Sequence, residues 1–287
     1  MIIVTGASGH LGNQIVQQLA KAVPAETVAV SVRDTARAAN LARLGVRVRE
    51  GDFTRPDSLR YAFEGATQVL VISAAIRGGG AAEANQAAID AAKGAGASRI
   101  LYTSHQAAAP DSLFPPQRVH AATEQHLARQ GNAFTALRNG FYANALGVHL
   151  DAALTTGRIV APEDGPVSWT AHEDLARAAV RALVGSGELD GVTAPLTGPA
   201  ALDLGQVADI LSEITGRTIT RETVGDEEWR EAAIARGLPP MVADFSLGMF
   251  RAARRGEFNV VDPTLEAVTG QPALPVEHTL RQLISER

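Results

Sequence analysis

Residues 2–12 read IIVTGASGHLG, an apolar run that leads through three glycines into a helical pattern. Gly6 suits a tight turn out of a strand, and Gly9 lets the backbone approach an anionic ligand without a Cβ in the way. Gly12 lets the helix pack closely on the sheet. The N–H groups at the start of that helix would face phosphate oxygens. The stretch therefore predicts a pyrophosphate-binding turn, and a purely structural turn is the alternative.

The first half of the chain alternates short apolar runs with alanine-rich stretches of helical length. The expected strands cover 27–32, 46–49, 68–73, 99–103 and 134–138. This alternation predicts an α/β fold, a Rossmann-type doubly wound parallel sheet with helices on both faces. Because ligands of such sheets lie at the carboxyl ends of the strands, chemistry is expected at Thr5-Gly6, Arg33, Asp52-Phe53, Ser73-Ala74, Ser104-His105 and Asn139-Gly140.

After about residue 145 the strands become shorter and proline becomes more frequent. Strands are expected at 158–161, 192–196 and 218–222, and helices at 173–184, 204–214, 226–236 and 240–254. We interpret residues 1–145 as an NAD(P)-binding Rossmann domain. Residues 146–287 form a smaller C-terminal lobe that covers the substrate and can interleave with the first domain.

Composition limits the other classes of function. The 287 residues carry 26 basic and 31 acidic side chains, a net charge of −5, so neither nucleic acid nor a membrane surface is an expected partner. No apolar run reaches the length of a membrane span, and the N-terminus has no signal-peptide pattern. The absence of cysteine excludes thiolate metal sites and fits a cytoplasmic location. The scattered histidines predict no metal site.

Cofactor choice depends on the residues that follow the second and third strands. Arg33 presents a planar cationic fork suited to the 2′-phosphate of NADP, whereas the adjacent Asp34 could bind the ribose of NAD. NADP(H) is the favoured prediction, NAD(H) the less favoured one, and an arginine that only caps the sheet edge is the structural alternative. Asp52 could accept from the adenine amino group with Phe53 against the ring, or Asp52 could belong to a plain turn.

On these residues the chain resembles the NmrA-like atypical short-chain dehydrogenases, and most closely the bacterial type-2 NAD(P)H:quinone oxidoreductases. The resemblance covers most of the chain. It is carried by GASGHLG at 6–12, Arg33, EGDF at 50–53, LYTS at 101–104, ALRNGFYANA at 136–145, the segment 167–180 and the segment 196–216.

The resemblance implies hydride transfer from NADP(H) to a quinone-like small molecule. It places the cofactor on Gly6, Gly9, His10, Leu11, Gly12 and Arg33, and lines the nicotinamide and substrate pocket with Ser73, Ser104, Asn139 and Tyr142. With the neighbouring strand-end and turn residues, the predicted cofactor set is Thr5, Gly6, Ser8, Gly9, His10, Leu11, Gly12, Arg33, Asp52, Phe53, Ser73 and Asn139. A homodimer is left open.

One family feature is missing. Typical short-chain dehydrogenases use a tyrosine with a lysine four residues later, but Tyr61, Tyr102 and Tyr142 are followed at that spacing by Gly65, Gln106 and Leu146. Gln125 stands where the related quinone reductases tend to carry a lysine. A quinone tolerates this loss better than a ketone does, because its reduced anion is a phenolate with a pKa of about 10.

The remaining candidates for proton donation are Ser104, His105, His120 and Tyr142, of which Ser104, His120 and Tyr142 are the predicted catalytic residues. His120 is attractive because histidine titrates near neutral pH. Two further hypotheses stay open. One is a non-enzymatic NADP(H)-binding redox sensor of the NmrA type, and a weaker one is an isomerase or epimerase on the same fold.

Overall fold

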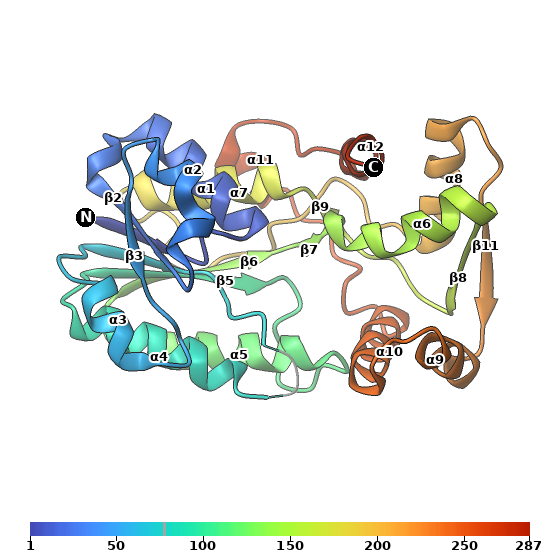
Figure 1. Ribbon diagram of the computed structural model, residues 1–287, viewed down its shortest axis with the longest axis horizontal. Helices are drawn as coiled ribbons and strands as arrows, with labels where there is room; N and C mark the ends of the chain where they lie inside the picture. The colour runs from blue at the N-terminus through green and yellow to red at the C-terminus, as the bar shows by residue number, and fades with distance from the viewer. Residues whose placement is uncertain (77–78) are drawn as a thin grey trace.

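A seven-stranded parallel sheet forms the centre of the computed structural model, which describes residues 1–76 and 79–287 (Figure 1). The strand order is β10-β6-β5-β4-β1-β2-β3, and every neighbouring pair is parallel. The strands are β1 Ile2–Thr5, β2 Val28–Val32, β3 Arg47–Glu50, β4 Gln68–Val71, β5 Arg99–His105, β6 Ala133–Asn139 and β10 Gly191–Val192. This confirms the predicted Rossmann-type doubly wound sheet.

Helices cover both faces of the sheet (Figure 1). One face carries α1 His10–Ala22, α2 Ala39–Ala42, α7 His172–Val184 and α11 Thr264–Thr269, and Ile15, Leu19 and Leu175 are buried there. The other face carries α3 Pro56–Ala62, α4 Ala81–Gly94 and α5 Pro115–Ala128, with Leu59 and Ile89 in its core. These apolar stripes hold the helices to the sheet and leave its carboxyl edge open for ligands.

The strand order reverses at β1, which lies between β2 and β4. In open parallel sheets, the crevice at such a switch point is the usual ligand site. Thr5 connects the carboxyl ends of β1 and β4. Its buried hydroxyl donates to the Leu70 carbonyl at 3.2 Å and accepts the Ile72 N–H at 2.9 Å. The side chain of Thr5 therefore has a structural role that shapes the crevice.

The C-terminal part packs beside the carboxyl edge of the sheet (Figure 1). Its elements are α6 Gly147–Thr156, β8 Arg158–Pro162, α8 Leu204–Thr215, β11 Thr220–Val224, α9 Asp226–Ala235, α10 Pro240–Arg254 and α12 Val276–Ser285. β8 pairs with β11, and β7 Phe141–Tyr142 pairs with β9 Trp169–Thr170. Three 3₁₀ turns complete the fold: η1 Ala25–Thr27, η2 Thr35–Ala38 and η3 Ala143–Leu146. Residues 146–287 also contribute β10 to the central sheet and α7 to the helices that cover it.

The strand expected at 192–196 is shorter than predicted, since β10 covers only Gly191–Val192. Beyond it the Thr193 N–H still donates to the Ala136 carbonyl at 3.0 Å, but the Arg138 N–H binds the Thr193 hydroxyl at 3.0 Å in place of a main-chain carbonyl. Pro195 has no N–H to offer, and regular pairing ends before it. Leu196 then donates its N–H to the Arg138 carbonyl at 2.8 Å. The segment follows β6 without forming a continuous ladder.

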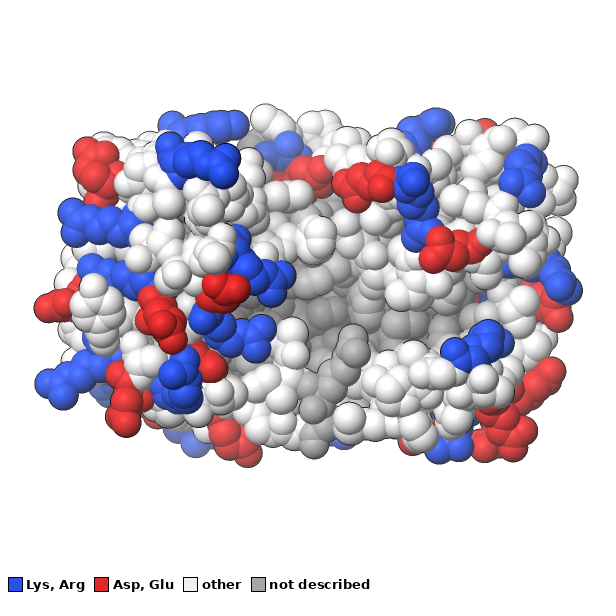
Figure 2. All heavy atoms as spheres, in the orientation of Figure 1, with Lys and Arg blue, Asp and Glu red and all other residues white. Residues whose placement is uncertain are grey.

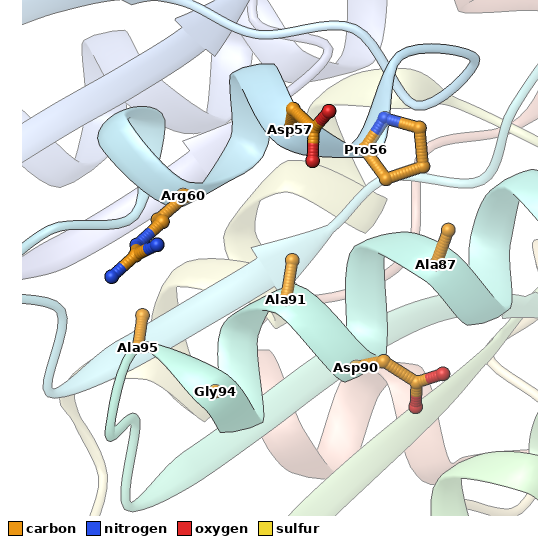
Figure 3. A pocket seen from close by; sticks show the side chains of 8 residues that line it. All are labelled: Pro56, Asp57, Arg60, Ala87, Asp90, Ala91, Gly94 and Ala95. Carbon is orange, nitrogen blue, oxygen red and sulfur yellow. The ribbon is translucent and has the colours of Figure 1, made fainter.

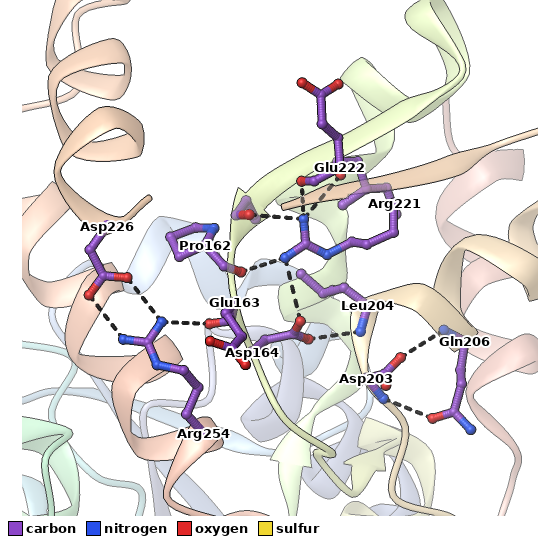
Figure 4. Close-up of polar contacts among 12 residues, drawn as sticks. Pro162, Glu163, Asp164, Asp203, Leu204, Gln206, Arg221, Glu222, Asp226 and Arg254 are labelled. Atoms are coloured by element: carbon purple, nitrogen blue, oxygen red, sulfur yellow. Dashed lines mark hydrogen bonds and ion pairs between the residues drawn. The ribbon is translucent and has the colours of Figure 1, made fainter. Parts of the chain in front are cut away.

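A polar clamp fixes the outer part of the C-terminal lobe (Figure 4). Arg221 of β11 donates to the carbonyls of Ile159, Ala161 and Pro162 and pairs with Asp164 at 3.4 Å. The second carboxylate oxygen of Asp164 accepts the Leu204 N–H at the start of α8, at 2.8 Å. Arg254 at the end of α10 binds both oxygens of Asp226 and the Glu163 carbonyl. These contacts anchor α10, which supplies one wall of the site.

Candidate functional site

A cavity of about 770 Å³ lies at the carboxyl ends of β1 and β4, where Figure 2 shows a hollow in the surface between the sheet and the C-terminal lobe. Its walls come from the glycine turn and the start of α1, residues 72–76 after β4, residues 79–83 and Asn85 of α4, the first turns of α5, and Tyr142, His172 and Phe245. The volume lies within the range of small-molecule sites. The position is the one the sheet topology favours.

The glycine turn has the features of an anion cradle. Gly6 has a φ of +60°, which a residue with a Cβ adopts poorly. A Cβ at Gly12 would lie 2.5 Å from the Gly6 carbonyl oxygen, so α1 packs directly on the turn. Gly9 caps α1 without any side-chain hydrogen bond, which leaves the N–H groups of the first turn free for a ligand. These residues fit a dinucleotide pyrophosphate.

Arg33 and Asp34 differ in the partners they have already engaged. Asp34 caps η2 by accepting the Ala36 N–H at 3.0 Å. Arg33 is exposed, and its guanidinium has no hydrogen-bond or ion-pair partner within residues 1–76 and 79–287. A free guanidinium after β2 suits the 2′-phosphate of NADP(H). This difference favours Arg33 over Asp34 as the ligand-binding side chain.

Two predicted adenine-side residues lie outside the cavity lining. Asp52 accepts the N–H and the hydroxyl of Thr54 at 2.9 and 2.8 Å, and pairs with Arg55 at 3.6 Å. The Thr54 hydrogen bonds hold the pKa of Asp52 below its ordinary value. Phe53 packs partly against the core below. These contacts match the turn alternative for Asp52, and the adenine role stays a prediction.

The far end of the cavity is apolar. Pro115, Pro116 and Val119 come from the start of α5, and Phe245 comes from α10. Behind them Phe114 contacts Phe245 edge-to-face, with ring centroids 4.9 Å apart. Glu83 is the one formally charged side chain among the described lining residues, and it is exposed. This wall can hold a flat, uncharged molecule by burying apolar area.

His120 lines the cavity and is connected to the protein interior. Its Nδ1 lies 2.8 Å from the hydroxyl of the buried Tyr102. Burial lowers the pKa of His120 to about 4. The expectation of a charge change near neutral pH is therefore wrong, because desolvation disfavours the imidazolium. At pH 7 the cavity faces a neutral imidazole.

Ser104 occupies a different environment from the one predicted. It is buried, and its hydroxyl donates to Glu124 at 2.6 Å. Glu124 in turn accepts two bonds from Arg138, at 3.0 and 2.8 Å. Among the described residues that line the cavity, Ser104 does not appear. Its hydroxyl proton is committed to a carboxylate beneath the site, and this removes the geometric support for Ser104 as a proton donor.

Tyr142, His172 and His10 form an aromatic corner of the cavity. The rings of Tyr142 and His172 meet edge-to-face at 4.6 Å, and those of His10 and His172 stack at 6.3 Å. Burial, with a further contribution from His10, lowers the pKa of His172 to about 4. Burial also raises the pKa of Tyr142, so its hydroxyl stays protonated. Tyr142 is thus a neutral hydrogen-bond donor at the cavity.

Asn139 lies beneath this corner at the end of β6. It is 1% exposed, and its Oδ1 has no hydrogen-bond partner in the described part of the chain. An orphaned buried acceptor is unusual and commonly serves a ligand. Of the other predicted residues, Leu11 and Ser73 line the cavity, whereas Ser8 lies in the β1–α1 turn outside the lining.

The sequence reasoning missed several residues of this cavity. His172 and Phe245 are distant in the sequence from the glycine motif, and no local pattern distinguishes them. Asn85 lies in the alanine-rich helix α4, where a lone amide on the buried face is a usable signal. The two lysines of the chain, Lys21 on α1 and Lys93 on α4, are exposed and do not line the cavity.

A second hollow lies between α3 and α4, with Pro56, Asp57 and Arg60 on one side and Ala87, Asp90 and Ala91 on the other (Figure 3). It has no lining residue in common with the central cavity. Within the described ranges, no group of histidines and carboxylates could hold a metal ion, and no helix there is long and apolar enough to cross a bilayer.

Comparisons with known proteins agree with this geometry. A profile of an NAD(P)H-binding family matches residues 6–184. Quinone oxidoreductase 2 of Escherichia coli is 32% identical over 99% of both chains. A crystal structure of an NADPH-dependent quinone oxidoreductase from that organism, complexed with NADPH, gives a TM-score of 0.92 at 32% identity and covers 99% of this chain and 100% of its own.

Two further relatives act on other acceptors, according to their names. The NAD(P)H azoreductase of Xenophilus azovorans is 31% identical over 95% of this chain and 94% of its own. The triphenylmethane reductase of Citrobacter sp., complexed with NADP(H), gives a TM-score of 0.88 at 29% identity, with coverage of 99% and 100%. These matches confirm the resemblance that the sequence motifs carried.

Proposed function

This chain belongs to the NAD(P)H-binding family, and on that premise we propose that it is an NADPH-dependent reductase of quinones and similar flat conjugated acceptors. The observation that carries the proposal is the two-ended cavity. One end is a glycine turn with free N–H groups, and the other is an apolar wall around Val119 and Phe245. The cavity thus offers a pyrophosphate cradle and an apolar acceptor site in one space.

The cofactor end assigns roles to residues of the turn. Gly6 and Gly9, whose own N–H groups donate to the carbonyls of Ser31 and Gly6, would shape the turn so that the pyrophosphate reaches the free N–H groups at the start of α1. Arg33 would bind the 2′-phosphate that distinguishes NADPH from NADH. Asn139 lies beneath the cavity and is not among its described lining residues, so its role toward the nicotinamide stays a prediction from the sequence. NADPH supplies a hydride to the acceptor when it is bound there.

The acceptor end explains how turnover proceeds without a tyrosine–lysine pair. A reduced quinone is a phenolate, which is far less basic than the alkoxide of a reduced ketone, so a strong acid is not required. Val119 and Phe245 provide apolar contact, while His120 and Tyr142 are neutral donors at the cavity. The main contribution of the protein is to hold acceptor and cofactor close together.

The relatives widen the acceptor class beyond quinones. Azo and triphenylmethane compounds, to which the names of two of the relatives refer, share extended conjugation with quinones. The apolar wall described above discriminates little among such molecules. We therefore include dyes among the acceptors to be tested.

The test mixes purified protein with NADPH and a panel of benzoquinones, naphthoquinones and an azo dye. The absorbance of the reduced nicotinamide is followed. We expect acceptor-dependent oxidation of NADPH and none with a simple aliphatic ketone. A protein that binds NADPH, yet oxidises it no faster with any acceptor than a Gly9→Val variant does, would contradict the proposal and favour the redox-sensor alternative.

A further inference from the structure

A chain of hydrogen bonds runs from the backbone at the end of β4 to the cavity face of α5. The Ala74 N–H donates to Asn85 Oδ1 at 2.8 Å. Asn85 Nδ2 donates to the Tyr102 hydroxyl oxygen at 3.2 Å, and that hydroxyl lies 2.8 Å from His120 Nδ1. Asn85 and Tyr102 are each 0% exposed. These hydrogen bonds therefore connect one backbone N–H and two buried side chains to one histidine at the cavity.

The first donor determines the direction of the first two bonds in this hydrogen-bond chain. A backbone N–H can only donate, so the group of Asn85 that faces Ala74 is the carbonyl oxygen. The amide nitrogen of Asn85 must then face Tyr102, and it too can only donate. The Tyr102 oxygen accepts that bond, and its own proton can go to His120 Nδ1 or to Thr123 Oγ1, which also neighbours this hydroxyl and donates its own proton to the Val119 carbonyl. We assign the Tyr102 proton to His120 Nδ1, because an imidazole nitrogen is a stronger acceptor than a hydroxyl oxygen. A neutral imidazole that accepts at Nδ1 carries its proton on Nε2.

The other edge of the His120 ring faces the cavity. Nδ1 is engaged with the buried Tyr102, while His120 itself lines the cavity. Nε2 has no hydrogen-bond partner within the described part of the chain, and it is not among the enclosed unpartnered atoms. The Nε2–H is thus available to a molecule bound there.

We propose that Asn85 and Tyr102 are positioning residues that fix the proton of His120 on Nε2, so that a neutral imidazole donates a hydrogen bond to the acceptor oxygen that becomes negative. This inference rests on the proposed function. A neutral imidazole can serve as an electrophilic donor of this kind. A donor placed in advance at a developing oxyanion stabilises the transition state more than the ground state.

The electron and proton balance does not require His120 to give up its proton. The acceptor gains a hydride from NADPH, which is oxidised to NADP⁺, and becomes a monoanion. Water then gives one proton to that anion and leaves hydroxide in the solvent. His120 keeps its Nε2–H throughout, which agrees with the lowered pKa of its imidazolium, about 4, and with the pKa of Tyr102, which burial raises above its ordinary value.

Other titratable groups surround His120 and must be separated from it in any experiment. His105 of β5 lies closest, with ring centroids 6.0 Å apart, and Tyr102 belongs to the chain itself. The remaining groups line the same cavity from α1, α4, β7 and α7: His10, Glu83, Tyr142 and His172. A readout that is specific to His120 is therefore needed, rather than a pH profile of activity alone.

The direct test is ¹⁵N NMR of histidine side chains in the protein without added ligand, with His120 assigned from its absence in a His120→Gln spectrum. We expect His120 to be neutral and protonated on Nε2, with signals that do not change between about pH 5.5 and 8. An Nδ1–H tautomer, or an imidazolium at pH 7, would overturn the inference. This readout does not require activity, so it stands even if no acceptor is reduced.

An isosteric variant of Asn85 is expected to reverse the direction of the hydrogen bonds between Asn85, Tyr102 and His120. In Asn85→Asp, a carboxylate replaces the amide donor and must accept from the Tyr102 hydroxyl, which then turns its lone pairs toward His120. We expect Nδ1 to become protonated and kcat for quinone reduction to fall about tenfold or more, with the Kd for NADPH unchanged. An unprotonated Nδ1 or an unchanged kcat in a folded Asn85→Asp protein would contradict the inference.

Tyr102→Phe and Tyr61→Phe are matched variants for the same question. Tyr61 is 66% exposed on α3, so loss of its hydroxyl should leave kcat and the histidine spectrum unchanged. In the Tyr102→Phe background, Asn85→Asp should no longer protonate His120 Nδ1, because the link between them is gone. Coupling that persists without the Tyr102 hydroxyl would overturn the proposed chain. Thermal unfolding verifies that each variant is folded.

Discussion

The two ends of the central cavity are built in different ways. The cofactor end consists of main chain from consecutive residues 6–12, with its shape determined by glycines and by the first turn of α1. The acceptor end consists of side chains from α5, β7, α7 and α10, a set that spans more than 100 positions of the sequence. The first end is therefore sensitive to a single added Cβ, and the second depends on which side chains the fold brings together.

Substitution of Gly9 is expected to have the largest effect, because an added side chain would occupy space that the bound cofactor needs. Its φ of −86° and ψ of 168° suit any residue, and an added Cβ would meet only the Gly6 carbonyl oxygen, at 3.4 Å. Gly9→Val should fold normally and weaken NADPH binding about 100-fold, as expected for two lost charge-assisted hydrogen bonds. Fluorescence titration measures the Kd, and an unchanged value would show that the turn is only structural.

Substitution of Gly12 should affect stability instead, because an added side chain would collide with the protein's own main chain. A Cβ there would lie 2.5 Å from the Gly6 oxygen and 2.9 Å from the Ala7 Cα, both main-chain atoms. Gly12→Ala should lower the free energy of unfolding by about 2 kcal/mol. Gly94→Ala is the control, since nothing lies within 4 Å of its added Cβ. Urea denaturation that shows equal stability for both variants would contradict this account.

Arg33 tests whether side chains also contribute to the cofactor end. Arg33→Ala should weaken NADPH binding about tenfold to 30-fold and leave NADH binding unchanged, because only NADPH carries the 2′-phosphate. Arg60→Ala, at the separate hollow between α3 and α4, should affect neither cofactor. Equal losses for NADPH and NADH in Arg33→Ala would rule out a specific contact with the 2′-phosphate.

Val119 tests the apolar wall, where the expected effect is smallest. Val119→Asp places a carboxylate in the acceptor end and should raise KM for an uncharged quinone about fivefold to tenfold, with the Kd for NADPH unchanged. Val148→Asp is the control, because Val148 is 80% exposed on α6. If Val119→Asp instead weakened NADPH binding and left KM unchanged, the assignment of the two ends would be reversed.

Much of the fold follows from local patterns in the sequence. The apolar runs that predicted strands at 99–103 and 134–138 correspond to β5 and β6, and the helices expected at 226–236 and 240–254 correspond to α9 and α10. The strand expected at 192–196 failed because Thr193 and Pro195 interrupt its pairing with β6, and this depends on the neighbouring strand. Local periodicity does not contain that information.

The candidate site divides in the same way. The glycine turn lines the cavity as predicted. Arg33, where a cationic partner was expected, has no hydrogen-bond or ion-pair partner among residues 1–76 and 79–287. Ser104 appeared well placed at a strand end, but Glu124 and Arg138 engage it beneath the cavity. A strand end indicates that a residue lies near the site, yet the direction of its side chain depends on what packs beside it.

The sequence by itself determined that this protein binds a dinucleotide, because a strand, a glycine turn and a helix N-terminus are consecutive and their geometry is set by backbone sterics. Only the tertiary structure decided the acceptor end. It brings Asn85, Tyr102 and His120 from three separate elements into one hydrogen-bond chain, with Asn85 and Tyr102 buried and His120 at the cavity. Burial determines whether the histidine is charged, and the direction of the chain determines which nitrogen holds its proton, so both depend on contacts between distant residues.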